Sequence, residues 1–539
     1  MLIIVALLVL GQVPAADVEK PGTATLRGHV LAADTGRPLR KAQVRILAGE
    51  IRENRVVTTD DGGRYEFKEV KAGRYTISAT KSSYVALSYG QTRPLEAGKP
   101  LDIKDGQTVE RLDFSLPLAG VITGRILDEF GEPLSDVMVA PMRYQFMQGK
   151  RTLVPAGRTA STDDNGDFRL FGVMPGQYYL QATWRTNNPF GSGDTPVAYA
   201  PMFFPGVLEA GEAQRFTIDI GQQLNDLAMT LKPMKAARVS GTILTSDGRP
   251  YSGMLNVMRT AANGMMTSNI GAMIRPDGTF QLNNLAPGDY QLRTFSNGPS
   301  GPDAEMGMAK LTVAGDDITD FQLVTSKALS VSGRLIVDAA AARSLPPGLF
   351  VNAFPFEGGP AGPSFNSPGR VADDYTFTLK TGPGRSRITV GSMPPGWSLR
   401  AVRLNGADVT DTGVELKANE NARGLEIELT NKTSTVTGLA TTGRGEASKD
   451  YTAVAFPQDS ERWKLTNSRY IRTGRPDQDG RFKISGLPPG EYLLVAVDRL
   501  EPGEATDPEF LERVHTKATR FSLLEGETKS IDVKLNSSS

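Results

Sequence analysis

The chain has 539 residues, of which 39% are hydrophobic. This length exceeds what one hydrophobic core supports, so we expect several domains. Lys plus Arg and Asp plus Glu are equal at 60 each, and this balance excludes the strongly basic field that nucleic-acid binding uses. The chain contains no cysteine, which excludes disulfides, thiolate metal sites and cysteine nucleophiles.

Residues 1–16 are predicted to be a cleaved signal peptide. The run from Leu2 to Leu10 is apolar, and the small-residue stretch from Val13 to Ala15 follows it at the place of a cleavage site, although a basic segment before the run is missing. The run is shorter than the ~20 apolar residues that cross a bilayer, so we expect no transmembrane span after cleavage. The mature protein is therefore predicted to be exported, and a periplasmic, a cell-surface and a secreted location all stay open.

The rest of the chain repeats a phrase of two parts. The first part opens with a glycine on an alternating strand and continues through a turn into a second strand, as in "GHVLAADTGRPLRKAQVRI". Period-two alternation on both sides of a turn predicts paired β-strands. The opening glycines are Gly28, Gly124, Gly241 and, in weaker copies, Gly333 and Gly438.

The second part of the phrase predicts a turn, a strand, a second turn and a second strand, as in "DFRLFGVMPGQYYLQA". Its first turn is rich in Asp, Asn and Gly, whose short side chains bond the local backbone or accept positive φ. A Pro-Gly turn at constant spacing then separates the two strands, and constant spacing fixes their register. The first strand carries an aromatic residue and the second a tyrosine, which we expect to meet on one buried face: Tyr65, Phe168, Phe280 and Phe482, and Tyr75, Tyr178, Tyr290 and Tyr492.

These motifs together resemble the carboxypeptidase regulatory-like domain. The resemblance is strong in the first two copies, fair in the third and fifth and poor in the fourth, where "DDYTFTLKTGPGRSRITV" keeps only Phe377, Leu379 and the Pro383-Gly384 turn. It implies a seven-stranded, transthyretin-like β-sandwich. It also implies an accessory, non-catalytic module of the kind found beside peptidase domains, in adhesion-type surface proteins and in starch-binding-like folds. No peptidase domain is recognised in this chain.

The predicted fold class is therefore all-β, with five tandem Ig-like sandwiches in a row. The junctions between units are short, and short junctions favour a semi-rigid rod. The predicted segments are a signal peptide at 1–16, sandwiches at 17–118, 119–235, 236–327, 328–432 (degenerate) and 433–535, and a tail at 536–539.

The sequence offers little support for catalysis. Its two histidines, His29 and His515, are far apart and lie in different units, and no nucleophile elbow or phosphate-binding glycine loop is present. A hydrolase that uses paired carboxylates stays as a minor alternative, because the 60 acidic residues cannot be ranked by sequence. We predict a non-enzymatic protein with no catalytic residue and no cofactor.

The acidic turn of unit two is a weak candidate for calcium. Asp163, Asp164, Asn165 and Asp167 cluster their oxygens, but Met174 stands where a calcium loop would have its bidentate glutamate. The favoured interpretation is a turn stabilised by its own side chains, with no metal.

The segment from Ala182 to Gly206 departs from the repeat and is the tentative ligand-binding site. Aromatic faces stack on sugar rings while neighbouring amides and acids bond hydroxyls. The alternative, favoured by the sequence, is that these rings cover an open end of the sandwich or a joint between units. The aromatic residues are Trp184, Phe190, Tyr199, Phe203 and Phe204.

The predicted function is an exported binding or adhesion module with carbohydrate, in the form of a polysaccharide, as the leading ligand. Binding would use aromatic loops or the addition of an outside strand to a free sheet edge. The alternative is a scaffold for a protein partner at the cell surface or in the periplasm.

Overall fold

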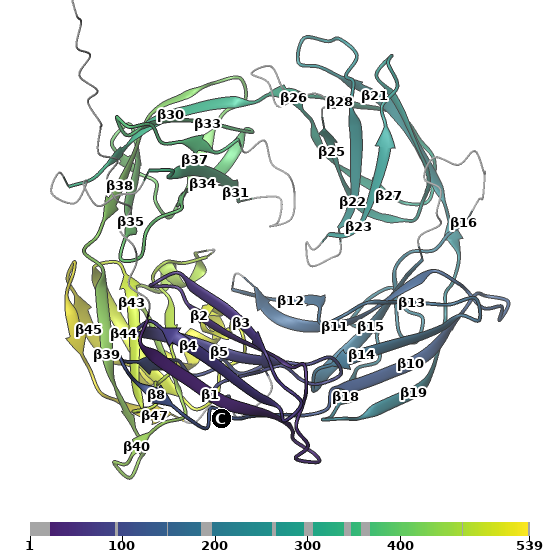
Figure 1. Cartoon of the computed structure of the whole chain (residues 1–539). Coiled ribbons are helices and arrows are strands. Elements are labelled where there is room, and N and C mark those ends of the chain that lie inside the picture. Colours follow the sequence, from purple (N-terminus) through teal and green to yellow (C-terminus); the bar gives the residue numbers. More distant parts are fainter. Residues whose placement is uncertain are drawn as a thin grey trace, which may run out of the picture.

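The computed structural model describes residues 22–91, 95–147, 149–184, 197–260, 266–295, 305–338, 347–356, 367–465 and 467–536. The described chain forms five two-layered β-sandwiches, which we number units one to five (Figure 1). The predicted all-β fold of tandem sandwiches is confirmed. The predicted signal peptide lies outside the described residues.

Unit three shows the plan of all the units, with one three-stranded sheet in the order β24-β21-β28 and one four-stranded sheet in the order β23-β22-β25-β27. The opening strand pairs antiparallel with the strand that carries the aromatic residue and parallel with the closing strand. The elements of unit three are β21 (Ala237–Leu244), β22 (Met254–Thr260), β23 (Met266–Met273), β24 (Thr279–Leu285), β25 (Gly288–Phe295), β26 (Glu305–Met306), β27 (Met308–Val313) and β28 (Ile318–Val324), and β29 (Ser326–Lys327) follows it.

Units one and two repeat this plan with additional short strands. The elements of unit one are β1 (Ala24–Ala32), β2 (Gln43–Ala48), β3 (Glu53–Thr58), β4 (Arg64–Val70), β5 (Gly73–Thr80), β6 (Leu87–Ser88), β7 (Leu101–Ile103), β8 (Thr108–Val109) and β9 (Phe114–Leu116). Those of unit two are β10 (Gly120–Leu127), β11 (Val137–Met147), β12 (Lys150–Pro155), β13 (Ala160–Ser161), β14 (Asp167–Val173), β15 (Gly176–Trp184), β16 (Val197–Ala198), β17 (Met202–Phe203), β18 (Phe216–Ile218) and β19 (Gln223–Thr230), followed by β20 (Met234–Lys235).

Unit four keeps the plan although its sequence matches the repeat poorly, and unit five adds helices to it. The elements of unit four are β30 (Leu329–Ile336), β31 (Phe350–Pro355), β32 (Gly369–Arg370), β33 (Thr376–Thr381), β34 (Gly384–Gly391), β35 (Ser398–Leu404), β36 (Ala407–Asp408), β37 (Val414–Leu416) and β38 (Ala422–Thr430). Those of unit five are β39 (Ser434–Thr441), β40 (Ala447–Ser448), β41 (Thr452–Pro457), η1 (Ser460–Lys464), β42 (Arg472–Gly474), β43 (Arg481–Leu487), β44 (Gly490–Val497), η2 (Glu504–Thr506), α2 (Pro508–Val514), η3 (His515–Lys517), β45 (Thr519–Leu523), β46 (Thr528–Ser530) and β47 (Val533–Asn536).

Each unit has its own hydrophobic core between its two layers, which in unit five are joined into one nine-stranded sheet because β47 pairs with both β39 and β44. The alternation predicted for the opening strand is observed in β1, whose buried residues alternate with more exposed ones. In unit one, Phe67 and Tyr75 are both fully buried, from strands in opposite layers. The repeated phrase therefore supplies the residues that join the two layers.

The opening glycines are explained by a close approach of two backbones. A Cβ at Gly241 would overlap the carbonyl oxygen of Phe321, because β28 bulges toward β21 at this point of the parallel pair. Asp320, the residue before the bulging carbonyl, has positive φ. The same overlap with the closing segment recurs at the four other opening glycines: Gly28 with Leu112, Gly124 with Leu227, Gly333 with Leu425 and Gly438 with Ile531.

For the repeated tyrosines, the hydrogen bonds of their hydroxyl groups explain why the repeat has tyrosine at this position. In each case the buried ring directs its hydroxyl to the carbonyl four residues upstream, just before the turn that joins the two strands, and phenylalanine could not make this bond. The bonds are Tyr75 to Lys71 (2.9 Å), Tyr178 to Met174 (2.7 Å), Tyr290 to Ala286 (2.6 Å) and Tyr492 to Pro488 (2.7 Å). Unit four has the buried Ser386 in the equivalent place.

Replacing Tyr178 with phenylalanine is expected to destabilise unit two by about 1–3 kcal/mol, because the Met174 carbonyl loses its donor in a partly buried turn. The protection of the β14 and β15 amides against hydrogen exchange in the full chain measures this loss of stability. Tyr144→Phe is the control, since the Tyr144 hydroxyl has no hydrogen bond in the described part of the chain. Equal protection in both variants would contradict the assigned role.

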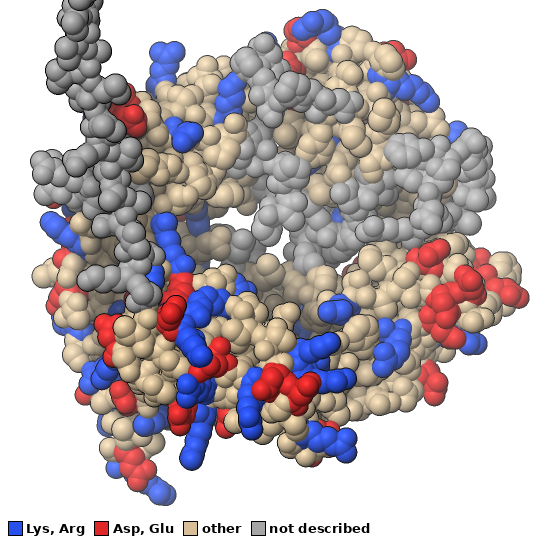
Figure 2. Space-filling view, in the orientation of Figure 1, with Lys and Arg blue, Asp and Glu red and all other residues tan. Residues whose placement is uncertain are grey.

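The five units form a closed ring, whereas the sequence predicted a rod (Figure 1). Unit five lies against unit one, where Arg475 pairs with Glu96 and the Gln478 amide bonds both backbone groups of Asp102. Figure 2 shows an opening at the centre of this ring and charges of both signs interspersed on the visible face. The junctions are short, as predicted, but each turns the chain in the same sense.

Unit five contains helices that the repeat did not predict. Helix α2 begins at Pro508, and the side chain of the N-cap residue Asp507 accepts the Glu509 N–H. This insertion buries Phe510 and Leu511 against β41 and β44 in a second core of unit five. It also meets the β11–β12 hairpin of unit two, since a Cβ at Gly503 would overlap the Phe146 carbonyl.

Across the described ranges, the structure contains no helix that is both long enough and apolar enough to cross a membrane.

Candidate functional site

The aromatic segment of unit two, Ala182 to Gly206, is described at 182–184 and 197–206, and these parts pack against their own sandwich. The rings of Trp184 and Tyr199 meet edge to face, with centroids 4.9 Å apart. Trp184 Nε1 donates to the Ser135 carbonyl (3.1 Å), and the Tyr199 hydroxyl donates to Glu129 Oε2 (2.6 Å). Burial and then the bond to Glu129 raise the pKa of Tyr199 above its ordinary value. The polar atoms of both rings are therefore already bonded within unit two.

The other predicted aromatic residues are not gathered into the same cluster. Phe203 is 8% exposed and packs with Met142 and Leu153 beneath the β11–β12 hairpin. Phe204 is half-buried against the main core of unit two. Phe190 lies outside the described residues. The structure thus brings Trp184 and Tyr199 together and places Phe203 in a separate group.

The same segment also builds the joint to unit three. Ala198 and Ala200 are buried with Ala286 of unit three. Strand β16 pairs with β20, which leads into the opening strand of unit three. The segment therefore has a structural task in addition to any contact with a ligand.

The acidic turn of unit two bonds its own backbone. Asp163 Oδ1 accepts the N–H groups of Asn165 and Asp167, each at 2.9 Å. Asp167 pairs with Arg125 at 2.7 Å, and this hydrogen bond holds the pKa of Asp167 below its usual range. Asp164 belongs to the exposed tip of the turn. Within the described ranges, no group of three or more acidic or histidine side chains is placed to hold a metal ion.

The two histidines are separated by the fold as well as by the sequence. His29 Nδ1 lies 3.3 Å from Asp113 Oδ1 on the surface of unit one. His515 Nδ1 lies 2.7 Å from the carbonyl of Glu512 at the end of α2.

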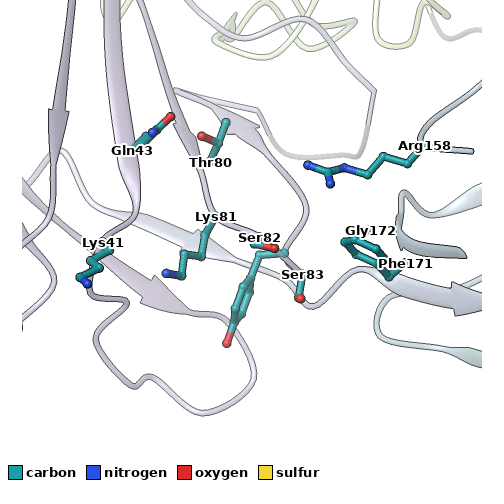
Figure 3. Close-up of a pocket in the computed structure, with 10 residues that line it drawn as sticks. Lys41, Gln43, Thr80, Lys81, Ser82, Ser83, Arg158, Phe171 and Gly172 are labelled. Carbon is teal, nitrogen blue, oxygen red and sulfur yellow. The ribbon is translucent and has the colours of Figure 1, made fainter. Parts of the chain in front are cut away.

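A polar cleft of about 400 Å³ lies where unit one meets unit two (Figure 3). This volume falls within the range of about 300–1,000 Å³ that is usual for small-molecule sites. Unit one supplies two lysines, an amide and four hydroxyl groups, and unit two supplies an arginine and a phenylalanine. The lining residues are Lys41, Gln43, Thr80, Lys81, Ser82, Ser83, Tyr84, Arg158, Phe171 and Gly172.

The cations of this cleft come from both units. Figure 3 shows Lys41 and Lys81 on unit one, with their amino groups directed away from unit two, and Arg158 extending its guanidinium toward unit one from unit two. The Arg158 guanidinium lies over the ring of Phe171, 5.3 Å from its centroid. No carboxylate is among the described residues that line the cleft, so their summed charge is positive although the whole chain is neutral.

The linker between the two units holds the walls of the cleft in place. The N–H groups of Val85 and Ala119 donate to the carbonyls of Pro117 (2.8 Å) and Ser83 (3.0 Å), which ties the linker to unit one. The N–H of Gly221 donates to the Leu118 carbonyl (3.0 Å) and ties the same linker to unit two. These bonds fix the backbone of the linker against both units that line the cleft.

Sequence reasoning did not identify this cleft. Its residues come from four separated segments, and none of them forms a recognisable motif. The run from Thr80 to Ser83, a cation among hydroxyl residues directly after the tyrosine strand, is the one local signal for it.

Comparison with known proteins agrees with the architecture of unit one. Residues 25–117 match the carboxypeptidase regulatory-like domain. This regulatory-like domain runs from β1 to β9, and one wall of the cleft belongs to it. No protein with a curated description matches the sequence.

Several solved structures were also found to be similar to parts of the chain beyond the regulatory-like domain. The Streptococcal ancillary pilin is 15% identical, with 56% of this chain and 98% of that chain covered and a TM-score of 0.21. The Bacillus anthracis TIE protein is 12% identical, with 77% and 74% covered and a TM-score of 0.15. Two B repeat units of the collagen binding protein of Staphylococcus aureus are 12% identical, with 76% and 99% covered and a TM-score of 0.14. TM-scores of this size do not establish a common fold over the aligned length.

Proposed function

We propose that this protein is an exported, non-catalytic binding protein of the adhesion type and that its ligand is a carbohydrate. The observation that carries the proposal is the cleft between units one and two, which is lined by an amide and four hydroxyl groups. Saccharides are recognised by such groups, which donate to and accept from sugar hydroxyls. The regulatory-like domain that forms one wall supports a non-catalytic role, because the family resemblance implies an accessory module.

Export is part of the proposal and depends on the apolar segment from Leu2 to Leu10. A periplasmic, a surface and a secreted location are equally consistent with it. Fractionation of cells that express the full chain measures this, and a protein recovered with its first residues intact in the cytosol would contradict export.

A panel of soluble and insoluble polysaccharides tests the carbohydrate ligand, with and without calcium. We expect the full mature chain to bind at least one polysaccharide. The variant Trp184→Ala is included because the aromatic segment of unit two stays a second candidate surface. Binding lost in that variant would assign the ligand to the aromatic segment, and binding retained would assign it elsewhere, whereas no binding at all would reject a carbohydrate ligand.

An alternative function, a scaffold for a protein partner, is supported by exposed methionines on unit three. Met254 and Met273 are direct neighbours on β22 and β23, and Met308 lies on β27 of the same sheet. They are 41%, 60% and 52% exposed. Clustered methionines adapt to varied apolar partners. A protein that binds the full chain but not Met254→Lys/Met273→Lys would support the scaffold, and equal binding to both chains would reject this surface.

A further inference from the structure

We propose that the cleft between units one and two recognises the acidic group of a saccharide, either a uronate carboxylate or a sugar sulfate. This inference rests on the proposed carbohydrate function. It adds the class of sugar and the residues that would bind its acidic group.

The charge of the cleft is the first argument. Lys41, Lys81 and Arg158 contribute three cations, and none of them has an ion pair with a carboxylate in the described ranges. Lys81 Nζ donates one hydrogen to the Arg40 carbonyl (2.9 Å), which leaves two for a ligand. Elsewhere in the structure, cations such as Arg125 and Arg475 are paired with acids. An anionic ligand would complete a pairing that the protein itself leaves open.

The placement of Arg158 is the second argument. Its guanidinium is held over Phe171 (5.3 Å), and Arg169 lies 5.8 Å from the centroid of the same ring. A guanidinium group donates two parallel hydrogen bonds to a carboxylate or sulfate, and stacking on a ring fixes its orientation beforehand. Phe171 thus acts as a positioning residue for Arg158.

The hydroxyl groups are the third argument, and they distinguish a saccharide from a small free anion. The side chains of Thr80, Ser82, Ser83 and Tyr84 make no hydrogen bond with other described residues, and the Gln43 amide makes none either. Gln43 and Thr80 are direct partners on β2 and β5, so the amide and one hydroxyl lie side by side. A sulfate ion can only accept hydrogen bonds and is too small to reach all of these groups at once, whereas a sugar acid has hydroxyls that also donate to the Gln43 side-chain carbonyl and the hydroxyl oxygens.

Calorimetric titration of the full mature chain tests the inference. The probes are trigalacturonate, a sulfated disaccharide, neutral maltotriose and inorganic sulfate. We expect the acidic saccharides to bind and the affinity to fall as salt is raised. In the double variant Lys41→Gln/Arg158→Gln we expect a loss of affinity of at least about tenfold, because two charge-assisted contacts disappear.

The matched control is Lys534→Gln/Arg423→Gln, which also removes one lysine and one arginine charge, but at exposed positions outside the cleft. Acidic saccharides that bind both double variants equally, or inorganic sulfate that binds as tightly as the saccharides, would overturn the inference. Binding of maltotriose without binding of the acidic probes would overturn it as well, while leaving the carbohydrate function intact. Failure of every saccharide, here and in the polysaccharide panel, would reject the carbohydrate function itself.

Discussion

Replacing Gly438 with alanine is expected to destabilise unit five by about 3 kcal/mol or more, the upper end of what overpacking costs. The new Cβ would overlap the carbonyl oxygen of Ile531 and lie 3.0 Å from the ring of Phe482. Both neighbours are fixed, since Phe482 is fully buried and Ile531 donates its N–H to Thr437. The clash can be relieved only by parting two strands of the same sheet. Hydrogen exchange of β39 and β43 in the full chain measures the loss.

Gly443 offers a matched control in the same unit. A Cβ at Gly443 would meet nothing within 4 Å, so Gly443→Ala should change stability by no more than about 0.5 kcal/mol. Similar protection of β39 in both variants would show that the close approach at Gly438 is not what the sandwich requires. The same reasoning applies to Gly241 and Gly333, where a Cβ would meet the neighbouring strand in the same way.

Removal of the Arg475 side chain is expected to open the ring between units five and one. Arg475 is 5% exposed and bonds Glu96 of unit one, which is 10% exposed, and also Asp450 of its own unit. Breaking a buried pair by deleting one partner costs about 3–5 kcal/mol, because the remaining charge stays desolvated. Small-angle X-ray scattering of Arg475→Ala should therefore show a larger radius of gyration than that of the unaltered chain.

A second variant separates ring opening from damage to unit five, because Arg475 also donates to the Tyr451 carbonyl within that unit. Glu96→Gln removes the charge on the unit-one side and should open the ring while the exchange of β39 and β41 stays unchanged. The exposed pair of Arg27 and Glu66 provides the control, and Arg27→Gln should leave the scattering unaltered. An unchanged radius of gyration in both interface variants would mean that other contacts hold the ring closed.

Other contacts at this joint belong to the same polar interface. Arg74 of unit one pairs with Asp102 (3.1 Å) and lies 4.0 Å from Asp477 of unit five. Burial raises the pKa of Asp102, while the charge of Arg74 opposes this effect. Lys99 reaches Asp450 across the joint at 3.4 Å. The joint is thus made largely of charges, in contrast to the apolar cores of the units it connects.

Most of the fold of a single unit could be predicted because its determinants are local. The spacing between the acidic turn and the turn before each tyrosine sets the length of β14 and the point at which the chain crosses to β15 in the opposite layer, where β14 pairs with β10 and β15 with β11. The role of the repeated tyrosine was predicted only in part. Its burial followed from the alternation of the strand, but the hydrogen bond from Tyr178 to the Met174 carbonyl was seen only in the structure. The sequence showed that a glycine recurs at the start of each unit. The structure showed why: a Cβ at this position would overlap the backbone of the closing segment.

The candidate sites were harder to predict for a different reason. The sequence grouped Trp184 and Tyr199 with three phenylalanines as one candidate site, and in the structure the rings of Trp184 and Tyr199 meet while their polar atoms bond Ser135 and Glu129. The cleft combines Lys41 and Lys81 of one unit with Arg158 of the next, and no local pattern links these three residues.

The sequence by itself determined that the chain is a series of β-sandwiches, where each one begins its repeat, and which rings fill the cores. These features depend on turns, alternation and backbone sterics, which act between residues of one unit. Only the tertiary structure decided that the row closes into a ring, that helices of unit five meet the hairpin of unit two, and that three cations share one cleft. The reason is that the turns at the successive junctions add up along the five units, and no pattern in the sequence encodes their sum.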